Sequence, residues 1–177
     1  MKRFKPLLLI AFAALAGCES MSVSECQVAD WGRVGLADGS RGESESRLSA
    51  YTEDCGKSGI RPNAKAYRQG WDVGIARFCT ATNGWREGTQ GHSGKEAVCR
   101  GQSGFNEFSH FLNAGLHVYR TNEQMRHNTQ ETNQLQNRLE KPGSDDEKRR
   151  IRSQLREIDY EQSRLRSQLS RQQMAAP

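Results

Sequence analysis

Glycine and cysteine are concentrated before residue 120, and this distribution limits how the chain can fold. Residues 18–119 contain 15 of the 17 glycines and all three tryptophans, whereas residues 120–177 contain one glycine and are rich in Gln, Arg, Glu and Leu. A glycine inside a helix costs up to about 1 kcal/mol relative to alanine, so any helix in the first part needs compensation from close packing. The sequence therefore predicts two parts, held together in different ways, with a boundary near residue 120.

Four cysteines follow Cys18 in the first part, and their number points to disulfides. Cys26, Cys55, Cys79 and Cys99 form an even set without a C-x-x-C pair. In an exported chain such a set indicates two disulfides, and the spacing argues against a metal site or a redox dithiol. Three connectivities are possible, and the number of cysteines does not choose among them.

A short internal repeat bears on this choice. Residues 35–42 and 84–91 both have the pattern G-x-x-[DE]-G-x-x-G, and the two copies start 49 residues apart. Each copy lies between two cysteines, and each closing cysteine is followed by a pair of glycines. We interpret residues 18–119 as one domain with two related units. This interpretation favours the pairings Cys26–Cys55 and Cys79–Cys99.

Helix signals in this domain are short. Residues 24–38 and 44–55 are predicted as an antiparallel helix pair, which would bring Cys26 to Cys55. A third helix is predicted from its N-cap Asn63 to Cys79, with Gly70 and Gly74 one turn apart where another backbone comes close. Asn83 and Gly84 together predict a turn.

The first 17 residues have the layout of an export signal. Three basic residues between positions 2 and 5 precede an apolar run over 7–14 and the sequence Leu-Ala-Gly before Cys18. The run is too short to span a bilayer, and its ending resembles the bacterial lipobox, where the chain is cut before a cysteine that carries lipid. We expect residues 1–17 to be a lipoprotein signal peptide and Cys18 to be lipidated. The alternative is an ordinary export signal followed by a chance cysteine.

The pattern of Cys, Gly and aromatic residues in the first part is fairly specific. It consists of Glu25-Cys26, Asp30-Trp31, Gly35, Asp38-Gly39, Gly42, Cys55, Tyr67, Gly70, Gly74, Phe78-Cys79, Asn83-Gly84, Gly88, Gly91 and Cys99. It resembles the bacterial lipoprotein family catalogued as domain of unknown function 2799, over roughly residues 18–119. The resemblance implies an envelope location and a disulfide-stapled domain, and it implies no activity.

Location and charge narrow the range of partners. Glu19 follows Cys18, and by analogy with lipoprotein sorting, in which Asp there favours the inner membrane, we expect an outer-membrane lipoprotein facing the periplasm. Without the signal, 23 Lys and Arg face 21 Asp and Glu, which lowers the net charge from +5 to +2. Neither part has the one-sided basic surface that nucleic-acid binding needs. We expect a membrane anchor and a protein partner, no nucleic acid and no cofactor.

The part after residue 120 predicts an antiparallel two-helix coiled-coil hairpin. One helix runs from Gly104 to Lys141, a turn follows at 142–144, and a second helix occupies 145–173, where Ser144 and Glu147 form a capping box. A seam spaced 4-3-4-3-4 runs along the second helix and contains Gln162 as its one polar position. We predict that its apolar members form the interaction face for a partner or a second copy: Ile151, Leu155, Ile158, Leu165 and Leu169. Asn128 and Thr132 make the seam of the first helix more polar.

Few residues suggest a chemical activity. Asp38 and Glu87 occupy equivalent places in the two units, where they suit acid–base work or, more simply, capping of backbone N–H groups. Trp31, Trp71 and Trp85 suit a glycan-binding groove or a core. The four histidines lack the spacing of a metal site, and no catalytic motif is present. We expect a mainly α, non-enzymatic envelope lipoprotein that acts as a scaffold through its coiled coil. The alternative is a periplasmic glycan-binding module or enzyme that uses these acidic and tryptophan residues.

Overall fold

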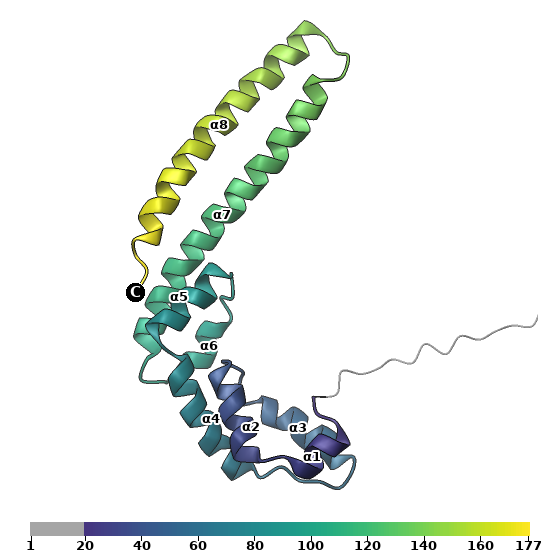
Figure 1. Ribbon diagram of the computed structural model, residues 1–177, viewed down its shortest axis with the longest axis vertical. Helices are drawn as coiled ribbons and strands as arrows, with labels where there is room; N and C mark the ends of the chain where they lie inside the picture. The colour runs from purple at the N-terminus through teal and green to yellow at the C-terminus, as the bar shows by residue number, and fades with distance from the viewer. Residues whose placement is uncertain (1–19) are drawn as a thin grey trace, which may run out of the picture.

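The computed structural model describes residues 20–177, which form eight helices and no strand (Figure 1). The helices are α1 Val23–Val28, α2 Trp31–Ser40, α3 Arg47–Gly56, α4 Ala64–Phe78, α5 Ala81–Thr89, α6 Lys95–Cys99, α7 Phe105–Leu139 and α8 Asp145–Gln173. The predicted mainly α fold, with a stapled domain followed by a long hairpin, is confirmed. Among the described helices, none is both long and apolar enough to cross a membrane. Cys18 and the predicted signal segment lie outside the described residues.

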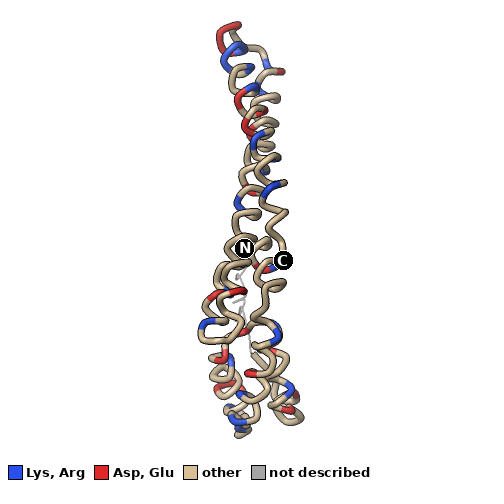
Figure 2. Tube along the Cα trace, turned by 90° about the vertical axis from the view of Figure 1, so that its left-hand side faces the viewer, with Lys and Arg blue, Asp and Glu red and all other residues tan. Residues whose placement is uncertain are grey.

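Three main helix–helix contacts follow one another along an elongated, curved molecule (Figure 1). Helix α2 packs on α4, α5 packs on the first part of α7, and the rest of α7 pairs with α8. Seen from the side, the molecule is narrow along its whole length (Figure 2). Because α7 belongs to both the domain and the hairpin, one continuous helix joins the two.

Glycines allow α2 and α4 to touch backbone to backbone. A Cβ atom added to Gly35 would lie 2.0 Å from the Tyr67 carbonyl oxygen, and one added to Gly70 would lie 1.9 Å from the Gly32 carbonyl oxygen. Gly74 meets the Leu36 carbonyl oxygen in the same way, at 2.4 Å. The predicted close approach at Gly70 and Gly74 is confirmed, and it supplies the packing that compensates for glycine's poor helix propensity.

The same kind of contact joins α5 to α7. A Cβ atom on Gly84 would lie 2.3 Å from the Phe108 carbonyl oxygen, and one on Gly88 would lie 2.2 Å from that of Leu112. The turn predicted at Asn83 and Gly84 is therefore wrong, because both residues lie inside α5, which begins after its N-cap Thr80. An Asn-Gly pair usually marks a turn, but here the glycine is needed for helix packing.

The N-terminal helix prediction also needs correction. The helix expected over 24–38 is two helices, because the Asp30 side chain accepts a hydrogen bond from the Arg33 N–H and starts α2 as its N-cap. The predicted disulfides are both present. Cys26–Cys55 joins α1 to α3 with a Cα–Cα distance of 5.7 Å, and Cys79–Cys99 joins the ends of α4 and α6 at 5.6 Å.

The hairpin follows the predicted bounds closely. The second helix occupies residues 145–173 as expected, and Ser144 accepts a hydrogen bond from the Glu147 N–H. The capping box is only half formed, because the Glu147 side chain pairs instead with Arg138 of α7 at 3.1 Å. This ion pair joins the two arms at the tip.

Candidate functional site

The buried acidic residue Asp38 was one candidate for chemistry, and the structure encloses it completely. It is 0% exposed, and the Tyr51 and Tyr67 hydroxyls donate hydrogen bonds to its Oδ2 at 3.0 and 2.9 Å. Arg41 donates to Oδ1 at 2.6 Å, and Arg47 donates to the Tyr51 hydroxyl at 2.8 Å. The expected capping of backbone N–H groups is wrong for Asp38, since it lies inside α2, where backbone N–H groups already bond within the helix.

The phenols around Asp38 remain protonated. Burial and, after it, the hydrogen bond to Asp38 raise the pKa of Tyr67 far above its usual range. The same two causes, in the same order, raise the pKa of Tyr51. Both groups therefore stay hydrogen-bond donors to the carboxylate. Because they come from α3 and α4, the cluster ties these helices to α2 and fits a structural role for Asp38.

Glu87 occupies the matching place in the second unit with different partners. It is 7% exposed, and its carboxylate contacts His92 Nδ1 at 2.9 Å and Arg86 at 3.4 Å. Phe108 stands where Tyr67 stands in the first unit, because their carbonyl oxygens meet the equivalent glycines Gly84 and Gly35. No phenol is available at that position, so a side chain of the following loop serves instead. The expected capping of backbone N–H groups is replaced by side-chain contacts here too.

The tryptophans and histidines do not assemble a site around these acids. Trp31 and Trp71 are core residues at 8% and 7% exposure, and the Trp71 indole N–H donates to the Glu43 carbonyl. Trp85 is half-buried on α5. Within residues 20–177, no group of three His, Cys, Asp or Glu side chains is placed to hold a metal ion. No observation in this domain favours catalysis or glycan binding.

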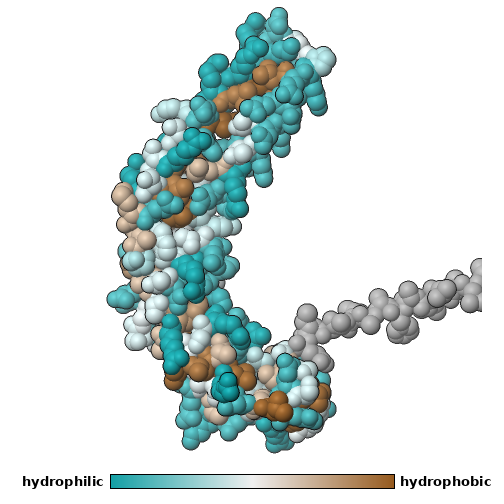
Figure 3. Space-filling view, viewed as in Figure 1, coloured by the Kyte–Doolittle hydropathy of each residue, from teal (hydrophilic) through white to brown (hydrophobic). Residues whose placement is uncertain are grey.

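The predicted interaction seam lies inside the hairpin. Ile151, Ile158 and Leu165 are 2%, 8% and 5% exposed, and Ile151 and Ile158 pack in one cluster with Leu135 of α7. Leu155 and Leu169 are half-buried. Since α7 of the same chain covers this seam, its apolar residues hold the hairpin closed. Any surface for a partner must lie beside the seam rather than on it. Figure 3 shows hydrophobic side chains gathered between the arms near the tip.

The half of the hairpin nearer the domain is joined by polar side chains. Thr121 donates to Gln172 at 2.9 Å, and Gln162 donates from Nε2 to the Met125 carbonyl at 3.4 Å. Asn128 is 3% exposed, yet its Nδ2 has no hydrogen-bond partner, and neither has Oε1 of Gln162. A buried polar group without a partner costs about 1–3 kcal/mol. This half is therefore incompletely satisfied by its own chain.

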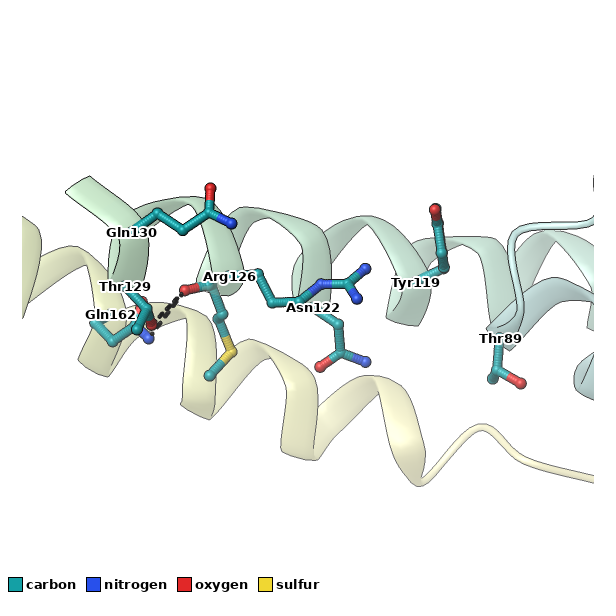
Figure 4. Close-up of a pocket in the computed structure, with 8 residues that line it drawn as sticks. Thr89, Tyr119, Asn122, Arg126, Thr129, Gln130 and Gln162 are labelled. Atoms are coloured by element: carbon teal, nitrogen blue, oxygen red, sulfur yellow. Dashed lines mark hydrogen bonds between the residues drawn. The ribbon is translucent and has the colours of Figure 1, made fainter. Parts of the chain in front are cut away.

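A groove runs along the hairpin beside Gln162, which carries one of these unpaired atoms. It has a volume of about 750 Å³ and is formed mainly by α7, with Gln162 contributed by α8 (Figure 4). A second groove of about 290 Å³ shares Thr129 and Gln162 with the first, so the two continue along the hairpin. Most of the residues that line the first groove carry polar groups, and one aromatic ring lies at the domain end: Thr89, Tyr119, Asn122, Met125, Arg126, Thr129, Gln130 and Gln162.

Charges on the hairpin are mixed rather than one-sided (Figure 2). Seven arginines of α8 are exposed, namely Arg149, Arg150, Arg152, Arg156, Arg164, Arg166 and Arg171. Arg149 pairs with Asp146, and Arg164 approaches Glu161 at 3.9 Å. These ion pairs offset part of the positive charge of this helix, as is usual for a solvated coiled-coil surface.

Sequence reasoning placed Asn128 and Gln162 on the seams but missed that they fail to pair. Each was visible as a polar interruption of the heptad pattern. Their lack of partners depends on the side-chain positions of two arms together, which no pattern in one arm contains. The tyrosine partners of Asp38 were missed for the same reason.

The family described as "Protein of unknown function (DUF2799)" matches residues 30–117. The match extends from the N-cap of α2 into the first part of α7 and leaves the hairpin outside. The resemblance noted from the Cys, Gly and Trp pattern is thereby confirmed. Neither the curated proteins nor the solved structures contain a significant match to the chain.

Proposed function

Residues 30–117 belong to the DUF2799 family, whose description names no activity, and we propose a function from the geometry of the hairpin. The protein is a lipid-anchored interaction protein of the bacterial envelope, which binds a helix of a partner protein in the groove between α7 and α8. Its anchor is the lipid on Cys18. The observation that carries the proposal is Gln162, which lines that groove and whose Oε1 has no hydrogen-bond partner.

A helical partner fits this groove for two reasons. First, the two continuous grooves follow the hairpin from Tyr119 to Gln136, about 25 Å at 1.5 Å per residue, which is the length of several helical turns. Second, the carboxamide of an Asn or Gln on such a helix offers a donor for Gln162 Oε1, and Gln162 lines both grooves. Binding would then remove the cost of that unpaired atom, which the free hairpin bears.

The fold also supports a scaffold role by its shape. Helix α8 is about 43 Å long at 1.5 Å per residue, and the hairpin that it forms with α7 projects away from the stapled domain (Figure 1). An anchored domain would hold this arm in the periplasm, within reach of partners that do not touch the membrane. We place the protein in the outer membrane, facing the periplasm.

The test is photo-crosslinking in intact cells. The photoreactive residue p-benzoylphenylalanine replaces Gln130, which lines the groove, or Tyr160, which is 76% exposed on α8 outside the groove. We expect a discrete protein adduct from position 130 and none from position 160. Mass spectrometry identifies the adduct.

Two variants sharpen the result. Gln162→Leu removes the unpaired group that lines the groove and should abolish the adduct at position 130, whereas Gln154→Leu changes an exposed glutamine of the same helix and should leave it intact. A position-130 adduct that survives Gln162→Leu, or the absence of any adduct in folded protein, would contradict the groove. An adduct with a second copy of this chain would replace the heterologous partner by self-association.

A further inference from the structure

Ser20, the first residue that the structure describes, is hydrogen-bonded to the domain. The Ser20 backbone N–H and hydroxyl both donate to Asp54 Oδ2, at 2.7 and 2.6 Å. Lys57 pairs with the other carboxylate oxygen at 2.7 Å. Asp54 lies in α3, next to Cys55, whose disulfide to Cys26 holds α1 on α3. Hydrogen bonds to an ionised carboxylate are among the stronger ones in proteins.

These contacts leave only a very short linker between Cys18 and the domain. Only Glu19 lies between Cys18 and Ser20 in the sequence, and two successive residue steps span at most about 7 Å. A lipid on Cys18 would therefore leave the lobe formed by α1 and α3 within about 7 Å of the attachment point. A linker of many residues, in contrast, would let the domain move freely above the membrane.

We propose that the contact between Ser20 and Asp54 is a clasp that holds the lobe of α1 and α3 against the lipid surface, so that this lobe is the membrane-facing surface of the protein. The inference rests on the proposed lipidation of Cys18. The occupant of the surface is the lipid bilayer at its headgroup level, because a lipid on Cys18 would hold this lobe within about 7 Å of the attachment point.

The exposed side chains of α1 fit such a surface. Five large hydrophobic residues are exposed among residues 20–177, and two of them, Val23 at 46% and Val28 at 84%, lie on this short helix. Cys26 is buried against α3, and since helix residues two apart point in nearly opposite directions, Val28 points away from the core. The Lys57 ammonium group offsets the negative charge of Asp54 where the chain leaves the domain, and its hydrogen bond, followed by those from Ser20, holds the pKa of Asp54 well below its usual range.

The clasp also has a structural consequence for the hairpin. If the lobe is fixed on the lipid surface, the direction of α7 relative to the membrane is fixed as well, since α7 is continuous from the domain to the tip. A partner would then bind the hairpin at a defined distance from the membrane surface.

Lipid photo-crosslinking of the acylated full-length protein tests the clasp. The protein is reconstituted into vesicles of phosphatidylethanolamine and phosphatidylglycerol with p-benzoylphenylalanine at position 28 or at position 160. We expect lipid adducts from position 28 at about ten times the level from position 160, and we expect Asp54→Ala to lower the position-28 yield about tenfold, because two charge-assisted hydrogen bonds are lost. Glu53→Ala, which changes an exposed neighbour, is the matched control.

Ser20→Pro provides a second route, since it removes both donors without touching a helix. Circular dichroism confirms that each variant is folded. Equal yields from positions 28 and 160, or a position-28 yield that neither Asp54→Ala nor Ser20→Pro lowers, would overturn the clasp while anchoring stands. If the protein carries no lipid mass on Cys18 and does not float with the vesicles, the anchoring and the clasp both fail.

Discussion

Replacing Gly70 by alanine is the sharpest test of how the stapled domain is held together. The new Cβ would lie 1.9 Å from the Gly32 carbonyl oxygen and 2.9 Å from the Leu36 backbone nitrogen, so the obstacle is backbone and not a movable side chain. Relieving it requires α2 and α4 to separate by more than 1 Å along the whole glycine contact.

The magnitude follows from two opposed effects. Overpacking costs up to about 3 kcal/mol, and the upper end applies because the contact is with backbone. Alanine in a helix returns up to about 1 kcal/mol relative to glycine. The free energy of unfolding should therefore fall by about 2 kcal/mol, which lowers Tm by roughly 4–8 °C for a chain of this size.

A second glycine in the same domain supplies the control. Gly56 lies at the end of α3 with nothing within 4 Å of an added Cβ. Gly56→Ala has only the helix-propensity gain, so it should leave the protein unchanged or stabilise it by up to about 1 kcal/mol. Both variants are compared with the wild-type chain by urea unfolding followed by circular dichroism, with disulfides intact. A Gly70→Ala protein as stable as Gly56→Ala would refute the backbone contact between α2 and α4.

Three further predictions concern individual side chains. Tyr67→Phe removes one donor to the buried Asp38 and should lower the free energy of unfolding by about 1–3 kcal/mol in urea titrations, whereas Tyr160→Phe, on an exposed ring, should not change it. Hydrogen bonds from Lys57 and Ser20 hold the pKa of Asp54 below its value in the unfolded chain. The stabilising contribution of Asp54 is therefore present above about pH 4 and is lost as the pH falls further. The difference in Tm between the wild type and Asp54→Ala should shrink below that pH. Asn128→Leu should raise the stability of the free hairpin by about 1 kcal/mol or more, measured as a higher urea midpoint, and an unchanged or lower midpoint would mean that Asn128 is satisfied by solvent.

The helices that carry strong local signals were predictable from the sequence. Asn63 caps α4 and Ser144 caps α8, and the heptad spacing predicted that the second arm would form one long helix. These signals are local, because a cap and a seam depend on residues within a few turns. The disulfide pairings were reached through the internal repeat, which carried information about residues far apart.

The glycine-rich helices were harder to predict. Gly84 after Asn83 has the composition of a turn, and only the carbonyl oxygen of Phe108 on another helix explains why the chain stays helical there. The side chains around Asp38 come from three helices. The glycine-rich sequence next to Asp38 contains no sign of the other two helices, so it suggested capping of backbone N–H groups instead. The seam of α8 was correctly located, but its partner turned out to be α7 of the same chain.

The continuity of α7 makes the hairpin a rigid lever. Between Leu116 and Leu139 the helix contains neither glycine nor proline, so no hinge interrupts it. About 30 Å of α7 lies beyond residue 119, at 1.5 Å per residue. A tilt of roughly 10° where Gly88 and Gly115 let α5 and α7 touch would therefore displace the tip by about 5 Å. A backbone contact inside the domain would thus set the position of the most distant residues of the hairpin.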